Sequence, residues 1–161
     1  MRITRATDYA VRATMHLAMV PASVRVREPA LAHAIDAPES FVSKVLQQLV
    51  QAGLVSSQRG ARGGFQLARP ADDISLLEVV EAIEGPTQFN LCVPLGPNGS
   101  RKDWCAAHSV WMEAQAALVN VLGRASIAQL TRDSSSNQAE LHRGLPVQRR
   151  NSRAPRKNSG G

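Results

Sequence analysis

The stretch that decides the fold is ESFVSKVLQQLVQAGLVSSQRGARGGFQLAR, residues 39–69. Its first half spaces apolar residues three and four apart, which predicts an amphipathic helix with a buried stripe of Phe41, Val42, Val45, Leu46, Leu49 and Val50. Gly53 is placed to end that helix in the left-handed conformation. A short strand starting at Leu54, the turn RGARGG and a second strand then predict a β-hairpin.

The polar face of this helix carries groups that can bond phosphates and base edges. Its members are Ser40, Ser43, Lys44, Gln47, Gln48 and Gln51. In the hairpin turn, Arg59 and Arg62 stand among three glycines, so the tip is basic and slim enough to enter a DNA groove or follow the phosphates. Taken alone, the pattern also fits an ordinary surface helix followed by a hairpin.

The flanking segments favour the DNA-binding interpretation. Residues 3–20 predict a first helix with Thr4 as its N-cap, and Glu28 opens a short second helix that runs to about Ile35. The turn Asp36-Ala37-Pro38 leads into the helix of the opening stretch. Helix, short helix, turn, longer helix and β-wing within about 70 residues is the order of a winged helix-turn-helix.

The second half of the chain predicts a helix, a loop, a long helix and a tail. The helix covers residues 74–84, with Asp72 and Asp73 as candidate caps, and the long helix runs from Cys105 to about Leu130. The apolar stripe of the long helix needs a cover, and a second subunit is the simplest one, although the stripe could also fold back on its own domain. The expected fold class is mainly α, with four parts: a winged helix-turn-helix domain (1–85), a cysteine-containing loop (86–104), a dimerisation helix (105–132) and a disordered basic tail (133–161).

Charge and composition exclude several classes of protein. Residues 1–132 hold thirteen Lys/Arg against eleven Asp/Glu, whereas residues 133–161 hold six against two, so the net charge of +6 comes largely from the tail. The placement of individual arginines, rather than global charge, therefore argues for nucleic acid. The sequence shows neither an apolar run long enough for a bilayer nor a signal peptide, which predicts a cytoplasmic protein. Phosphate-binding loops, HExxH and nucleophile elbows are also absent, so an enzyme is not expected.

Several of these segments match a known family. The chain resembles the bacterial winged-helix transcription regulators that include IscR, NsrR and RirA. The matching pieces are TDYAVRATMHLA, FVSKVLQQLVQAGLVSSQRGARGGFQLARP, ISLLEVVEAIEG, FNLC and WCAAH, in order over roughly residues 1–132. The resemblance implies a homodimer that binds a pseudo-palindromic double-stranded DNA operator, and the expected function is that of a repressor. It places Ser40, Ser43, Lys44 and Gln48 in the major groove, and Arg59, Gly60 and Arg62 at the wing contact.

The resemblance also implies an iron–sulfur sensor of redox state, nitric oxide or iron status. Cys92 and Cys105 match the outer two of three family cysteines, and residues 98–100 stand where the middle one would be. His108 follows Cys105 on the same helix face, and Asp8 matches a position that supplies a carboxylate from the other subunit. Such a mixed ligand set suits a [2Fe–2S] cluster better than a [4Fe–4S] cluster, since His can replace Cys on one iron.

The same four residues are also compatible with roles that need no cluster. The cysteines could be buried apolar residues, Asp8 could pair with Arg12, and His108 could cap or pack at the start of the long helix. Zinc on Cys92, Cys105 and His108 is chemically reasonable but lacks a second CxxC-type pair. A regulator without a cluster would respond instead through Cys92/Cys105 thiol chemistry, a small molecule or a protein partner.

Overall fold

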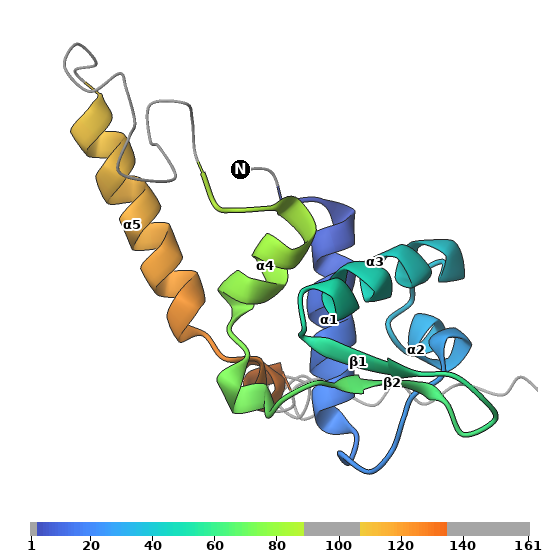
Figure 1. The fold of residues 1–161 in the computed structure, drawn as a ribbon. Coiled ribbons are helices and arrows are strands. Elements are labelled where there is room, and N and C mark those ends of the chain that lie inside the picture. Colours follow the sequence, from blue (N-terminus) through green and yellow to red (C-terminus); the bar gives the residue numbers. More distant parts are fainter. Residues whose placement is uncertain (1–2, 89–106, 135–161) are drawn as a thin grey trace, which may run out of the picture.

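The computed structural model describes residues 3–88 and 107–134, and its elements follow the predicted order (Figure 1). Three helices come first: α1 (Arg5–Met19), α2 (Glu28–Ala34) and α3 (Glu39–Gln51). The hairpin of β1 (Val55–Gln58) and β2 (Gly64–Leu67) follows, then a 3-10 turn (Ala71–Asp73), α4 (Leu76–Glu84) and α5 (His108–Arg124). No helix among the described residues is both long and apolar enough to cross a membrane. The fold is a winged helix-turn-helix domain with a long helix beside it.

The core forms where α3 packs between α1, α2 and α4. Val42, Val45, Leu46 and Leu49 of α3 are buried, as the spacing of the stripe predicts. Phe41 was expected in this stripe but is 51% exposed, and its ring meets the edge of Tyr9 at a centroid distance of 6.2 Å. Phe41 lies in the first turn of α3, and its ring contacts Tyr9 of α1. Val50 is only partly buried.

The backbone conformation at each end of α3 sets where the helix begins and ends. Asp36, between α2 and α3, has φ 51°, a left-handed conformation that Asp tolerates better than most residues. Pro38 occupies the N-cap position, so α3 begins at Glu39. Gly53 adopts φ 72° just beyond the C-cap, as predicted, and lets the chain reverse into β1.

The wing is wider than a two-stranded hairpin. β1 and β2 pair antiparallel from Val55 opposite Leu67 to Gln58 opposite Gly64. Val26, in the connection between α1 and α2, pairs with Phe65 on the other side of β2, with backbone N–O distances of 2.9 and 2.8 Å. β2 therefore lies between two partners, which ties the wing to the connection between α1 and α2.

The start of α4 differs from the prediction. Asp72 and Asp73 lie in the 3-10 turn and do not cap the helix. Ser75 caps it instead: its hydroxyl accepts from the Glu78 backbone N–H, and the Glu78 carboxylate accepts from the Ser75 backbone N–H at 2.9 Å. This reciprocal capping box arises because Ser75 stands three residues before a glutamate, a pattern that the two aspartates lack.

The Glu78 carboxylate also pairs with Arg69, in the segment that follows β2, and so connects the capping box to the wing. Burial alone would raise the pKa of Glu78, but hydrogen bonds from Ser75 and Arg69, together with the Arg69 charge, lower it below its usual 4.5. Because the folded pKa is depressed, this carboxylate stabilises the protein above the unfolded pKa. That contribution is lost as the pH falls through the lower, folded value.

We therefore expect Glu78→Gln to reduce stability at pH 7 and to flatten the loss of stability with acid below about pH 4.5. Urea unfolding of both proteins at a series of pH values measures this. Glu113→Gln, on α5, changes the same formal charge outside the box and provides the control. An equal loss of stability with acid in wild type and Glu78→Gln would contradict the role given to the Glu78 carboxylate.

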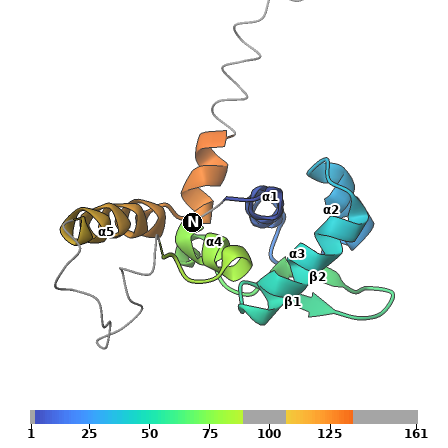
Figure 2. The ribbon, with the colours of Figure 1, turned by 90° about the horizontal axis from the view of Figure 1, so that it is seen from above.

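The expected single helix from Cys105 to about Leu130 is wrong in one respect. α5 ends at Arg124, Ala125 and Ser126 are extended, and residues 127–134 form a separate helical segment (Figure 2). The break is held by residues at and just before the start of α4: Leu76 donates its N–H to the Ala125 carbonyl, and Ile127 donates its N–H to the Ile74 carbonyl, both at 2.8 Å. The break directs Ile127 into the core, where it is fully buried.

Candidate nucleic-acid interface and sensor residues

The polar face of α3 is open along its length. Ser40, Lys44, Gln47 and Gln51 are exposed, and Ser43 and Gln48 are half-buried at its flanks. The buried stripe on the opposite face holds α3 against α1 and α4, so the polar side chains point away from the core. The predicted contact residues Ser40, Ser43, Lys44 and Gln48 thus lie along one outward face. Gln47 and Gln51 are as accessible as any of them.

The tip of the wing is a tight turn that depends on Gly63. The Gly63 N–H donates to the Gly60 carbonyl at 2.9 Å. A Cβ at Gly63 would collide with the Gln58 carbonyl oxygen, so a larger residue cannot fit without moving the turn. Arg59, Gly60 and Arg62 are all exposed around this turn. The sequence therefore places two cations on a tip whose backbone path is closely constrained.

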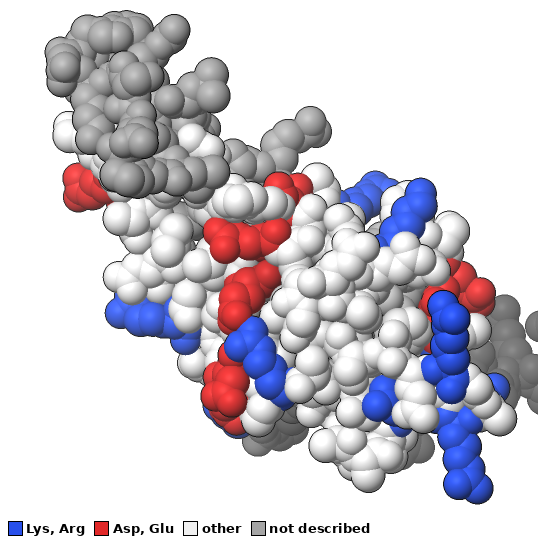
Figure 3. Space-filling view, in the orientation of Figure 1, with Lys and Arg blue, Asp and Glu red and all other residues white. Residues whose placement is uncertain are grey.

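Charge on the wing is of one sign. Residues 20–27 and 54–69, which together build the wing and its outer partner, contain Arg25, Arg27, Arg59, Arg62 and Arg69 and no acidic residue. α4 shows the opposite bias, with three glutamates and no basic residue. In Figure 3 the basic atoms accordingly gather toward the side where the wing lies, and acidic atoms lie over α4. Folding thus concentrates positive charge that the nearly balanced composition of residues 1–132 conceals.

The candidate cluster ligands are only partly described. Cys92 and Cys105 lie outside the described residues. His108 is the first residue of α5, and its Nδ1 is buried with no hydrogen-bond partner within the described part of the chain. A buried imidazole nitrogen without a partner suits a metal ligand, because burial without a bond is otherwise costly.

Asp8 fits a ligand role less directly. Its carboxylate forms an ion pair with Arg12 one turn further along α1, at 2.6 Å. To bind iron, the carboxylate would have to share or leave this partner. Within residues 3–88 and 107–134, no group of three or more His, Cys, Asp or Glu side chains could hold a metal ion.

Glu84 is a connecting residue that sequence patterns did not reveal. Its Oε1 accepts from the Thr4 N–H at 3.0 Å, from the Thr4 hydroxyl at 2.7 Å and from the Thr7 hydroxyl. Thr4 thus stands at the N-cap position of α1 as predicted, but its hydroxyl bonds α4 rather than its own helix. Because Glu84 ends α4 and Thr7 precedes Asp8, this contact joins the end of α4, just before the cysteine loop, to the helix that carries Asp8. The partners are about 80 residues apart, a separation at which no local pattern operates.

Comparison with known proteins decides the family. The Rrf2 model, described as an iron-dependent transcriptional regulator, matches residues 3–133. The chain belongs to the Rrf2 family of transcriptional regulators. This confirms the resemblance drawn from the sequence. This Rrf2 protein is a DNA-binding helix-turn-helix regulator of transcription and not an enzyme.

Individual relatives agree with the family assignment. The chain is 35% identical over 133 residues to protein aau3 of Rhizobium meliloti, covering 82% of this chain and 86% of that one. It is 30% identical over 135 residues to protein rrf2 of Nitratidesulfovibrio vulgaris, covering 84% and 90%.

Solved structures share the fold. T. potens IscR superposes with a TM-score of 0.68 at 26% identity, over 86% of this chain and 91% of that chain. CymR, the global cysteine regulator of B. subtilis, has a TM-score of 0.67 at 23% identity, over 82% and 97%. The winged-helix architecture expected from the sequence is therefore confirmed.

Proposed function

We propose that this Rrf2 regulator is a homodimeric repressor that binds a pseudo-palindromic operator and senses redox state, nitric oxide or iron status through an iron–sulfur cluster. The open polar face of α3 beside an acid-free, arginine-bearing wing carries the DNA part. In each half-site, Ser40, Ser43, Lys44 and Gln48 reach the major groove, while Arg59, Gly60 and Arg62 meet the DNA from the wing.

The exposed apolar surface of α5 supports the proposed dimer. No residue of this 17-residue helix is buried in the described chain, although it carries Val110, Trp111, Met112 and Val121 at 41–62% exposure. Val110 and Val121 are eleven residues apart and so share one helix face. An apolar helix of this length is stabilised when a second copy covers it.

We expect Val121→Asp to convert the dimer to a monomer, because a carboxylate would be buried without a partner in the proposed interface. Sedimentation velocity at micromolar concentrations measures the change. Val24→Asp introduces the same charge at an exposed valine in the α1–α2 connection and should leave the mass unchanged. A wild-type protein that sediments as a monomer would refute the proposed dimer.

The sensor part rests on the unpartnered Nδ1 of His108 together with the family of the chain. Cys92, Cys105 and His108, with Asp8 of the second subunit, would hold a [2Fe–2S] cluster in preference to a [4Fe–4S] cluster. Bound iron would supply the redox chemistry. In that arrangement Glu84 would keep the start of the cysteine loop against α1, so a change at the cluster reaches the helix that packs on α3.

Anaerobic isolation tests this proposal. We expect visible absorbance with about two iron and two sulfide per chain, values that follow from the [2Fe–2S] assignment with one cluster per subunit. Cys105→Ser and His108→Ala should lower the iron content, whereas His33→Ala, an exposed histidine on α2, should not. A colourless protein after anaerobic reconstitution would refute cluster binding.

The ion pair between Asp8 and Arg12 supports a second candidate, a regulator without a cluster. In that case the carboxylate serves only α1, and Cys92 and Cys105 act as a redox thiol pair or the loop binds a small molecule or protein partner. Oxidant, but not iron, would then alter DNA binding, and Cys105→Ser would leave the metal content unchanged. A gel-shift titration with peroxide and with Fe²⁺ separates the two candidates.

A further inference from the structure

The connection between α1 and α2 is built into the wing. Val26 pairs with Phe65 on the outer side of β2 through both backbone hydrogen bonds. Gly64, the first residue of β2, comes so close that a Cβ there would lie 2.6 Å from the Val26 carbonyl oxygen. The backbone of residue 26 is thus closely packed against the strand that leads out of the wing tip.

The residue that follows reaches the tip itself. Arg27 is exposed, and its Nη2 donates to the Ala61 carbonyl at 2.5 Å. Ala61 is in the middle of the turn, between Arg59 and Arg62. The guanidinium therefore bonds the backbone midway between the two cations proposed to meet DNA.

We propose that Arg27 is a positioning residue that holds the wing tip in its DNA-binding conformation before DNA arrives. This inference rests on the proposed role of the wing in DNA binding. A turn with three glycines in six residues loses much conformational entropy when it becomes ordered. A charge-assisted bond to its central carbonyl lowers that entropy in the free protein, so less is lost on binding.

A direct contact between Arg27 and a phosphate of the DNA would also make Arg27 important for binding. The two explanations predict different mobility of the wing tip in the DNA-free protein. Holding the tip affects its mobility whether or not DNA is present. A phosphate contact leaves the free tip unchanged and instead adds to the salt dependence of binding, by about one unit of slope for each contact.

The experiment compares wild type, Arg27→Ala, Arg27→Lys and Arg132→Ala as full-length, ¹⁵N-labelled proteins. Arg132, in the helical segment after α5, is exposed and serves as the charge-matched control. The readouts are the backbone ¹H–¹⁵N NOE of residues 60–63 without DNA, and affinity for a duplex selected from random sequence by the wild type, measured at several salt concentrations. Protection of the Val26 and Phe65 amides reports that the pairing of Val26 with β2 is intact.

With Arg27→Ala we expect lower NOE values at residues 60–63 and roughly three- to tenfold weaker binding with an unchanged salt slope. Arg27→Lys should restore part of both effects, because an ammonium can also donate to the carbonyl, and Arg132→Ala should change neither. Unchanged tip NOE values, or a looser tip with undiminished affinity, would overturn the proposal. A wild type that selects no duplex would instead refute the proposed DNA contact of the wing, while the NOE comparison still decides the role of Arg27.

Discussion

Replacing Arg59 with alanine is expected to weaken operator binding by at least about tenfold, because an arginine contact to a base or phosphate contributes about 1–3 kcal/mol and a dimer loses one in each half-site. Arg59 is exposed at the end of β1, and the Gly60–Gly63 hydrogen bond shapes the turn that follows it. Fluorescence anisotropy with a selected duplex, repeated at several salt concentrations, measures the change.

The salt dependence distinguishes how Arg59 acts. If Arg59 neutralises a phosphate, the slope of log affinity against log salt falls by about one per contact; if it reads a base, discrimination at one position of the site relaxes. Arg132→Ala removes the same charge from an exposed pair with Asp72, in the 3-10 turn after the wing, and should change affinity little. Undiminished affinity of Arg59→Ala would contradict the placement of the wing on DNA.

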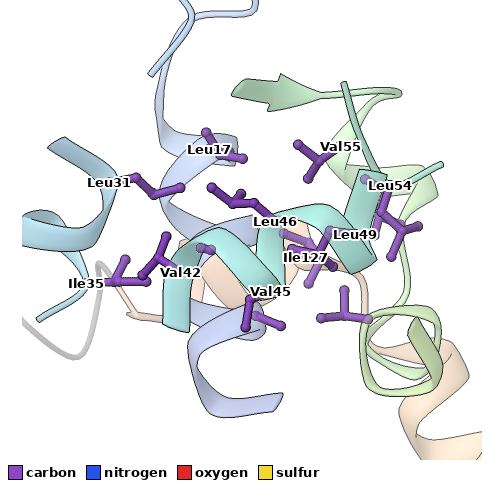
Figure 4. Close-up of a cluster of buried hydrophobic side chains, with 14 of the residues drawn as sticks. Leu17, Leu31, Ile35, Val42, Val45, Leu46, Leu49, Leu54, Val55 and Ile127 are labelled. Atoms are coloured by element: carbon purple, nitrogen blue, oxygen red, sulfur yellow. The ribbon is translucent and has the colours of Figure 1, made fainter. Parts of the chain in front are cut away.

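Ile127→Ala is expected to lower the free energy of unfolding by about 2–5 kcal/mol, the usual effect of removing a buried isoleucine side chain and leaving a cavity. Ile127 is fully buried in the cluster that contains Leu46 and Leu49 of α3 (Figure 4). It also follows directly after the break that ends α5. Chemical denaturation at a fixed protein concentration measures the loss, since a dimer makes stability depend on concentration.

Ile3→Ala provides the matched control, because it makes the same chemical change at a residue that is 66% exposed and should cost less than about 0.5 kcal/mol. Equal losses for the two variants would mean that Ile127 does not belong to the core of the DNA-binding domain. A large loss for Ile127→Ala alone would show that the segment after α5 stabilises the domain that contains α3.

Local patterns predicted the elements of the wing domain well. Three local features carried this prediction: the apolar spacing in residues 39–51, Gly53 and the RGARGG turn. Each acts between residues that are close in the sequence, so it can be recognised without the structure. The long helix was predicted less well, because the amino acids of residues 105–130 favour a helix throughout and do not signal a break. The interruption at Ala125 and Ser126 comes from backbone bonds to Ile74 and Leu76, which no local pattern encodes.

The candidate site divides in the same way. The polar face of α3 and the two wing arginines followed from residue type and spacing, and the structure places them on outward surfaces. The Glu84 contacts and the Arg27 bond could not be predicted, because their partners are 77–80 and 34 residues away. Of the proposed sensor ligands, the structure describes His108 on α5 and Asp8 on α1.

The sequence by itself determined that an amphipathic helix, a glycine stop and a basic hairpin follow one another, and it identified the family. Those features depend on helical periodicity, turn chemistry and the order of residues, all of which are local. Only the tertiary structure decided that Val26 and Arg27 complete the wing, that Glu84 joins α4 to α1 and that Ile127 enters the core. Each of these is a contact between distant segments, and packing of the whole domain, rather than any local preference, selects it.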